Sequence, residues 1–499
     1  MDGDVIIIGS GIGGLIAGAS LAKMGKRVLV FEQHSIPGGY ATAFQRKKYR
    51  FEVSLHLLGD LDEGGMIHNI YEKIGILPSV KFYKVSALYK AVYPDYSLIA
   101  RYNSDYITEL QNLFPDEAEE IEELLDTFVK IRMEILLINK KSIQGEFINM
   151  PLDAPLVNKF RNLNLTEMLN EFLTSANLKS VISQYWLYFG LPPSKISAIF
   201  YAYVWTEYFL YGGFYPHDRS QAISDRLVEI IKSYNGEVHV KCKVKKIIVE
   251  DGKATGIELQ NGEIYTSEYI ISNADLKATF KDMVGYNHIK KRYINQIENV
   301  EPSISCVQVY LCLDIDLPTV YNEKNHEIFV NEKYDLEEAY ADIIEDKIEE
   351  APFAITIYDN IIKDYNEVGK STLSIIQLSY YDNWHGLSMS KYKQKKERTM
   401  KCLVSRLEKI FPQITEHIVF KNISTPLTNE RYTGNQRGAI YGAAQTVNQS
   451  LNKRISQMTP IRNLLLVGAW SKPASGYSGC TWSGYNVAQI IGGGKINDC

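Results

Sequence analysis

The sequence predicts an α/β protein in which an open, mainly parallel sheet is combined with an inserted α+β domain. Three observations carry this prediction. The chain opens with a β-branched run, a glycine-rich turn and a helical stretch. A second apolar run that ends in glycine follows near the other terminus. The 499 residues provide enough chain for two or three domains.

The first elements occur in the order of a Rossmann-type dinucleotide-binding unit. Residues 5–8 are typical of a buried parallel strand, residues 15–24 of a helix, and residues 28–31 of a second strand. The turn before the helix is Gly9-Ser10-Gly11-Ile12-Gly13-Gly14, which matches the pattern G-x-G-x-x-G. In this context the turn predicts a site for the pyrophosphate of a dinucleotide.

The chemistry of a dinucleotide explains the residue types. Gly9 allows the tight turn, Gly11 lets a pyrophosphate approach the backbone, and Gly14 lets the helix pack on the strand. Glu32 stands directly after the second strand, where its carboxylate can accept hydrogen bonds from both ribose hydroxyls. The same carboxylate would repel a 2′-phosphate, so NADP is disfavoured.

A second glycine pair, Gly38 and Gly39, follows this acid. It suits a backbone that passes close to a bulky flat cofactor, and a simple reverse turn is the alternative. From this pair to Ser54-Leu55-His56-Leu57-Leu58-Gly59, the chain resembles the phytoene desaturase, carotenoid isomerase and retinol saturase group of FAD-dependent oxidoreductases. This group belongs to the flavin amine oxidase-like superfamily, and the His56 segment is most similar to its retinol saturase branch.

The resemblance implies a glutathione reductase-like FAD domain, with FAD rather than NAD as the resident cofactor. We expect FAD to bind noncovalently, because no histidine or cysteine stands in a recognised attachment motif. The resemblance continues through residues 238–249, 254–259 and 264–271, which read as a three-stranded meander after a helix over 222–233. It implies that the strand around Val244 lies against the adenine and that the chain returns to the FAD domain at Asn273.

The last cofactor motif lies near the C-terminus. Residues 464–470 read as a buried strand that contains Gly468, and Ser483-Gly484 is expected to open a helix over 485–491. Between them, the resemblance implies cofactor contacts for Gly476-Tyr477-Ser478-Gly479. Many members of the group have an aspartate where this chain has Ala469, so a backbone N–H must take its place or the cofactor is held more loosely.

The resemblance and the element pattern divide the chain into two domains. We expect residues 1–65, 210–285 and 425–499 to form the discontinuous FAD-binding domain. Residues 66–209, mostly helical in pattern, and 286–424 would form the substrate-binding domain. Eleven aromatic residues between 185 and 211 predict either an ordinary helical core or the wall of a pocket for a long, flat, apolar molecule. The lysine- and arginine-rich stretch 391–406 predicts a solvated helix face, or else a dock for anionic lipid or an acidic carrier.

Composition limits the remaining possibilities. The net charge of −5 argues against nucleic-acid binding, because no excess of positive charge is available for phosphates. The six cysteines are far apart, so we expect free thiols in a reducing compartment and no metal site. The uncharged stretch 5–22 is interrupted by glycines and preceded by acids, unlike a signal peptide or membrane span. We expect a cytoplasmic protein, and contact with a membrane surface stays open.

The function implied is an FAD-dependent oxidoreductase that exchanges hydride with an apolar, polyene-like substrate, free or carrier-bound, with an unknown electron partner. Desaturation, saturation and isomerisation of C=C bonds all fit. Two alternatives are a flavin amine oxidase and a non-enzymatic lipid-binding protein like the GDP-dissociation inhibitors. His56 and, more weakly, Tyr441 are the candidate catalytic side chains, with a structural histidine as the alternative for His56.

Overall fold

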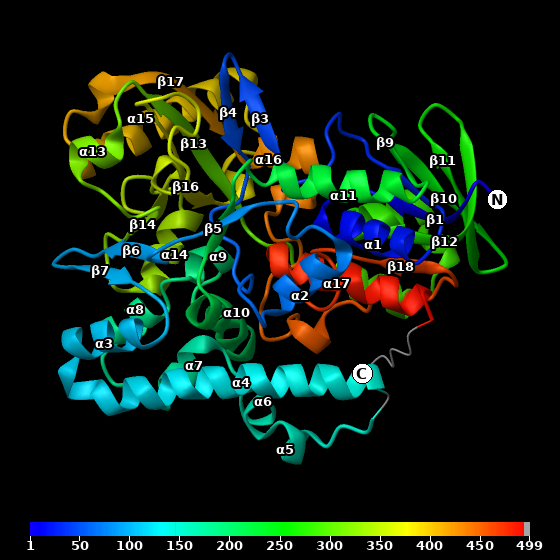
Figure 1. The fold of residues 1–499 in the computed structure, drawn as a ribbon, viewed down its shortest axis with the longest axis horizontal. Helices are drawn as coiled ribbons and strands as arrows, with labels where there is room; N and C mark the ends of the chain where they lie inside the picture. Colours follow the sequence, from blue (N-terminus) through cyan, green and yellow to red (C-terminus); the bar gives the residue numbers. More distant parts are fainter. Residues whose placement is uncertain (145, 494–499) are drawn as a thin grey trace.

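The computed structural model describes residues 1–144 and 146–493. Within these residues, two seven-stranded sheets organise the chain, and two pairs of short strands accompany them. Figure 1 shows the first sheet with helices α1, α11 and α17 beside it, and the second sheet at the opposite end of the molecule. The FAD-domain segments predicted above contain every strand of the first sheet, and the substrate-domain segments contain every strand of the second.

The first sheet has the order β10-β11-β12-β1-β2-β9, and its seventh strand, β18, pairs with the last three residues of β12. Strand β1 pairs in parallel with β2 on one side and with β12 on the other. Strand β18 lies beyond β12, and β10, β11 and β12 form an antiparallel meander. The strands are β1 (Gly3–Ile8), β2 (Val28–Phe31), β9 (Glu237–His239), β10 (Val244–Glu250), β11 (Lys253–Leu259), β12 (Ile264–Ser272) and β18 (Leu464–Leu466).

The β1 side chains alternate between two cores, as a strand buried on both faces requires. Val5 and Ile7 pack with the helices α1 (Ile12–Lys23), α11 (Gln221–Ser233) and α17 (Gly476–Ile491). Ile6 and Ile8 pack toward the meander and the π-helical segment Ala278–Val284. The parallel sheet is therefore the middle of three layers.

Two predicted elements differ from the structure. The predicted strand 238–249 is two strands, because Lys241 has a positive φ of 57° and the chain turns there. At this turn the Lys241 N–H donates to the His34 carbonyl, and the Cys242 N–H donates to the Glu32 carbonyl. The last helix begins at Gly476 rather than near Tyr485. Its Gly484 lies inside the helix, where a Cβ would come within 2.2 Å of the Gly13 carbonyl oxygen of α1.

The second sheet has the order β17-β13-β16-β15-β14-β6-β7, antiparallel except between β14 and β6. One face packs on α15 (Met389–Ile410) through the odd-numbered residues of β13 from Val307 to Leu313. The strands are β6 (Tyr89–Val92), β7 (Ser97–Ala100), β13 (Ser305–Leu313), β14 (Glu327–Val330), β15 (Phe353–Ile357), β16 (Ser371–Ser379) and β17 (Ile418–Ser424).

Residues 66–209 are mainly helical, as predicted, with three short strands among the helices. The long α4 (Ala118–Gln144) packs beside α10 (Ala198–Tyr211), and Figure 1 shows α4 along one edge of the molecule. The other helices are α2 (Met66–Ile74), α3 (Ser104–Leu113), α5 (Met150–Asp153), α6 (Pro155–Phe160), α7 (Leu165–Leu169), α8 (Ala176–Ile182), α9 (Trp186–Phe189), α12 (Lys291–Glu298), α13 (Leu317–Tyr321), α14 (Leu336–Ile344) and α16 (Pro426–Thr433). The short strand pairs are β3 (Ala43–Arg46) with β4 (Tyr49–Glu52), and β5 (Phe82–Lys84) with β8 (Phe214–Pro216).

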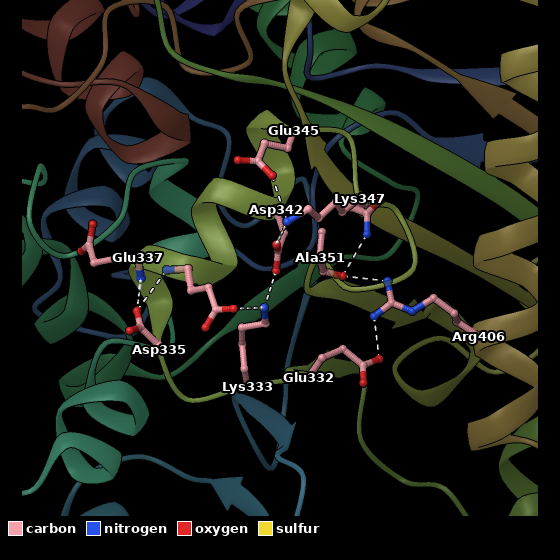
Figure 2. Close-up of polar contacts among 11 residues, drawn as sticks. Glu332, Lys333, Asp335, Glu337, Asp342, Glu345, Lys347, Ala351 and Arg406 are labelled. Atoms are coloured by element: carbon pink, nitrogen blue, oxygen red, sulfur yellow. Dashed lines mark hydrogen bonds and ion pairs between the residues drawn. The ribbon is translucent and has the colours of Figure 1, made fainter.

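The basic helix α15 is tied by polar contacts to the residues that flank α14, and Figure 2 shows Arg406 bonded to Ala351 and Glu332. Arg406 is buried and donates to the Ile348 and Ala351 carbonyls at 2.6 and 2.7 Å and to Glu332 at 2.7 Å. Earlier in the helix, Lys395 pairs with Asp346 at 2.6 Å, and Arg398 pairs with Glu349 at 3.4 Å. The expectation of a purely solvated face is therefore wrong at Arg406, since this side chain is part of the packing.

Candidate active site

A cavity of about 1860 Å³ runs from the carboxyl ends of the first sheet to the inner face of the second. The residues at or just after the ends of β1, β2, β12 and β18 line it, which is where open α/β sheets bind their ligands. A pocket for one small ligand is typically about 300–1,000 Å³, so this volume suits a large cofactor together with a substrate.

The predicted glycines shape the end of the cavity next to the first sheet. Gly9, Gly11, Gly13, Gly38 and Gly39 all line it. A Cβ at Gly11 would lie 2.7 Å from Asn273 Nδ2, and one at Gly39 would lie 3.2 Å from the Gly11 Cα. The cradle is therefore closed to side chains, while the first turn of α1 carries neither a side-chain cap nor an acidic residue. This is a place where the backbone can receive an anionic phosphate.

Glu32 lies at the wall of this end and is buried. Its Oε2 accepts hydrogen bonds from the backbone N–H and the hydroxyl of Ser10, both at 2.8 Å, and its Oε1 accepts from the His34 N–H at 2.8 Å. A carboxylate has about four acceptor positions, so one remains for a ribose hydroxyl. The expectation of two ribose bonds would require the Ser10 hydroxyl to turn away.

The other predicted cofactor residues fall into two groups. Val244, Asn273, Ala469 and the run Gly476-Tyr477-Ser478-Gly479 line the cavity, the last as the first turn of α17. Gly14 and Gly468 do not line it, and close packing accounts for both. A Cβ at Gly14 would lie 2.4 Å from the Gly9 carbonyl oxygen, and one at Gly468 would lie 2.3 Å from Asn273 Oδ1.

The aromatic stretch divides between the two roles predicted for it. Six of its eleven aromatic residues line the cavity and define what we call its aromatic part: Tyr185, Tyr188, Phe189, Phe200, Tyr203 and Tyr208. The other five pack in the helical core or against Arg132: Trp186, Tyr201, Trp205, Phe209 and Tyr211. Across the cavity, the even-numbered residues Cys306, Gln308 and Tyr310 of β13 complete the wall.

His56 lines the aromatic part of the cavity and contacts the second sheet. Its Nδ1 is 2.6 Å from Thr356 Oγ1 and 3.3 Å from Glu327 Oε2, and its ring is 5.8 Å from that of Tyr188. Burial lowers the pKa of His56, but the charge and hydrogen bond of Glu327 outweigh it and raise the pKa above its ordinary value. The imidazole therefore holds a proton more readily than a free histidine.

Tyr441, the weaker candidate, also lines the cavity. Its backbone N–H donates to Ser303 Oγ at 2.9 Å, which fixes the chain at this point. Burial, together with the charges of Cys306 and Glu327, raises the pKa of the Tyr441 phenol, so the hydroxyl stays neutral. It can donate or accept a hydrogen bond but does not supply a base.

Glu207 is a titratable cavity residue that the sequence reasoning missed. Burial and the charge of Asp60 raise its pKa to about 8, although Arg132 and a hydrogen bond with Ser478 act in the opposite direction. A signal for it was present, because Glu207 is the single acid in the aromatic stretch 185–211. Glu327 and Thr356 were also missed, and nothing local in the sequence connects them with His56.

Two absences concern the described residues alone. Among them, no group of three or more His, Cys, Asp or Glu side chains is placed to hold a metal ion. Five cysteines, Cys242, Cys306, Cys312, Cys402 and Cys480, are free thiols, and Cys499 lies outside this part of the chain. No described helix is both long enough and apolar enough to cross a membrane.

The three-layer fold, the glycine cradle with Glu32 and the large adjoining cavity define a dinucleotide-dependent oxidoreductase, and their size and donor set fit FAD. The family model described as "Flavin containing amine oxidoreductase" matches residues 12–492, so the chain belongs to this family. It is an FAD-dependent oxidoreductase, as the sequence predicted.

Named relatives cover nearly the whole chain. A Daucus carota protein named "Prolycopene isomerase, chloroplastic" is 27% identical over 507 residues, which cover 98% of this chain and 80% of that protein. The Homo sapiens "All-trans-retinol 13,14-reductase" is 27% identical over 510 residues, 93% of this chain and 82% of that protein. A solved oxidoreductase structure from Methanosarcina mazei has a TM-score of 0.67 at 17% identity, with 97% and 100% of the two chains covered, and shows the shared fold.

Proposed function

We propose that the protein exchanges a hydride between FAD and a carbon of a long, apolar, polyene-like substrate, so that a carbon–carbon double bond is saturated, desaturated or isomerised. The single observation that carries the proposal is the aromatic wall of the cavity, to which six rings of residues 185–211 contribute. Aromatic rings bind flat conjugated chains by offset stacking and by apolar burial. The names of the two relatives refer to prolycopene and to all-trans-retinol, which are conjugated polyenes.

The residues of this chain would divide the work between the two ends of the cavity. FAD, when bound, supplies the hydride chemistry of its flavin ring. The glycine cradle and Glu32 would hold its phosphates and ribose, and the first turn of α17 would lie along it. The aromatic wall would orient the substrate and exclude water, which protects a hydride transfer from side reactions. Thr356 and Glu327 hold His56 through Nδ1, so Nε2 would be the ring nitrogen left for a proton or a substrate.

The aromatic wall and the glycine cradle disfavour the two alternatives. An amine substrate is a cation at neutral pH and would lose its hydration among the six aromatic rings of the wall, whereas an apolar chain is stabilised by burial there. A non-enzymatic lipid-binding protein has no need of the glycine cradle. In this cradle a side chain at Gly11, Gly13 or Gly39 would come too close to Asn273 or to neighbouring backbone.

Contact with an anionic membrane surface is a second part of the proposal. The cavity lining includes the exposed apolar residues Met389 and Tyr432 and the exposed cations Arg46 and Arg431. Apolar side chains mixed with cations favour anionic lipid, from which an apolar substrate could enter. Cosedimentation with vesicles that contain or lack anionic lipid tests this. Binding that ignores lipid charge and salt would contradict it.

Anaerobic stopped-flow absorbance at the flavin band tests the reaction. Carotenoid, retinoid and polyene acyl compounds are mixed with the oxidised enzyme and, separately, with the dithionite-reduced enzyme. Bleaching of the oxidised enzyme indicates desaturation, and reoxidation of the reduced enzyme indicates saturation. A change of substrate geometry that requires the reduced enzyme indicates isomerisation. Rapid bleaching by simple amines and none by polyenes would favour an amine oxidase instead.

A further inference from the structure

Glu207 is a buried glutamate in the wall of the aromatic part of the cavity. It lies on α10 just before the last turn, where the residue is 2% exposed and belongs to the cavity wall. Its Oε1 accepts no hydrogen bond from any described residue. This atom is itself buried, and a buried carboxyl oxygen without a partner is costly, so the Glu207 carboxyl group is stabilised when it carries a proton.

The groups around Glu207 come from four elements. Behind it lies an ion pair between Asp60 Oδ1 and Arg132 Nη2 of α4 at 2.7 Å, in which both side chains are at most 1% exposed. The Arg132 guanidinium lies over the Tyr203 and Tyr211 rings, at 4.8 and 5.4 Å from their centroids. Ser478, in the first turn of α17, and Tyr208 of α10 lie close enough to Glu207 to interact with its charge.

The charge balance of this cluster places a proton on Glu207. Asp60 already neutralises Arg132 and accepts a second hydrogen bond from the Met66 N–H at 3.0 Å. Ionising Glu207 as well would leave one net negative charge in the protein interior. Burial and the charge of Asp60 raise the pKa of Glu207 to about 8, and burial also raises the pKa of Asp60, which keeps its ion pair with Arg132. The cluster therefore holds a carboxylic acid at neutral pH, close to the value at which a general acid or base is most effective.

We propose that Glu207 is the proton-transferring catalytic residue of the cavity. The proposal rests on the proposed function and deepens it. In saturation, one carbon of the double bond receives hydride from reduced flavin, and the other receives the Glu207 proton. The π pair of the double bond forms the new C–H bond to that proton. The product is the saturated C–C bond, oxidised flavin and a Glu207 carboxylate, which Arg132 and Ser478 stabilise until solvent returns a proton.

The reverse reaction uses the opposite form of the same carboxyl group. In desaturation, the carboxylate accepts a proton from one carbon while the neighbouring carbon gives hydride to oxidised flavin, and the freed electron pair becomes the double bond. Saturation should therefore slow as the pH rises through about 8, and desaturation should speed up over the same range. The two directions thus predict opposite pH profiles.

The test compares the FAD-loaded wild-type protein with E207Q, which keeps the shape of the side chain but cannot transfer a proton. E122Q on α4, an exposed glutamate, serves as the control. In single-turnover mixing of reduced enzyme with a polyene, E207Q should be slower than wild type by about 10²- to 10⁴-fold. E122Q should behave as wild type.

A second readout is independent of activity. Infrared difference titration of the FAD-loaded protein should show a protonated-carboxyl band that disappears with a midpoint near pH 8. This band should be present in wild type and E122Q and absent in E207Q. Unchanged turnover in E207Q, or a band that persists in it, would overturn the proposal. If no polyene exchanges hydride with the wild-type flavin, the proposed function fails. The infrared comparison then decides by itself whether Glu207 carries the proton of the cavity.

Discussion

Glu327 and Thr356 lie opposite each other in the antiparallel pair β14–β15, and the Thr356 hydroxyl donates to Glu327 Oε2 at 2.8 Å. Since its single proton is used in this bond, the Thr356 oxygen accepts from His56 Nδ1 at 2.6 Å. Nδ1 therefore carries a proton, and protonation at Nε2 sets the charge of the ring. A cross-strand pair of the second sheet thus determines the tautomer of a histidine beside the first.

The first prediction concerns this pair. In E327Q the pKa of His56 should fall, because the charge that raises it is removed while the burial that lowers it remains. His56 should then lose its proton at a lower pH than in wild type. NMR titration of the His56 ring measures the change. E338Q, an exposed residue of α14, is the control, and an equal His56 titration in all three proteins would contradict the coupling.

Glu32 provides the second prediction. E32A should weaken FAD binding by about 1–3 kcal/mol, because a ribose hydroxyl and both donors of Ser10 lose their acceptor. Fluorescence titration of the apoprotein with FAD measures the affinity, and the exposed E63A is the matched control. FAD affinity that is equal in E32A and E63A would show that this carboxylate serves the turn alone.

Gly11 provides the third prediction. G11V should lose more FAD than E32A, since its Cβ would lie 2.7 Å from Asn273 Nδ2 and its methyl groups would fill the phosphate cradle. The purified variant should lack the yellow colour of the wild type, and heat or acid should release intact FAD from the wild type. G262N is the control, because that turn is open and asparagine tolerates a positive φ. A yellow G11V protein would contradict the assignment of the cradle.

The sequence predicted the parts of the site whose chemistry is local. The turn glycines and the acid after the second strand follow from neighbouring residues, and the structure brings Gly9, Gly11, Gly13 and Glu32 to one cavity. The pairing of His56 with Glu327 spans 271 positions and depends on the register of two strands, which no local pattern contains. Helix α17 begins earlier than predicted, because packing against Gly13 overrides the low helix propensity of its glycines.

Helix α15 provides the fourth prediction, which concerns stability. R406M should lower the free energy of unfolding by about 2–4 kcal/mol, because the buried Ile348 and Ala351 carbonyls keep only Gln377, among the described residues, as a donor and Glu332 loses its ion pair. R398M on the same helix removes a cation whose side chain is 68% exposed, so its effect should stay within about 0.5 kcal/mol. Chemical denaturation of the FAD-loaded proteins measures both. Equal losses would show that burial does not distinguish the two arginines.

The last prediction separates the aromatic residues of the cavity wall from those of the core. Tyr188 lines the cavity and stacks with Tyr185 at a centroid distance of 5.4 Å, whereas Trp205 packs against Phe209 at 4.6 Å without lining it. Y188A should therefore weaken binding of a polyene by about 1–3 kcal/mol, because a conjugated chain loses a stacking surface. W205F should instead lower stability, because it leaves a cavity in the core, and should leave substrate affinity close to that of wild type. Single-turnover rates against substrate concentration give the affinities, and denaturation gives the stabilities. If both variants bind the polyene as wild type does, the substrate does not lie against this wall.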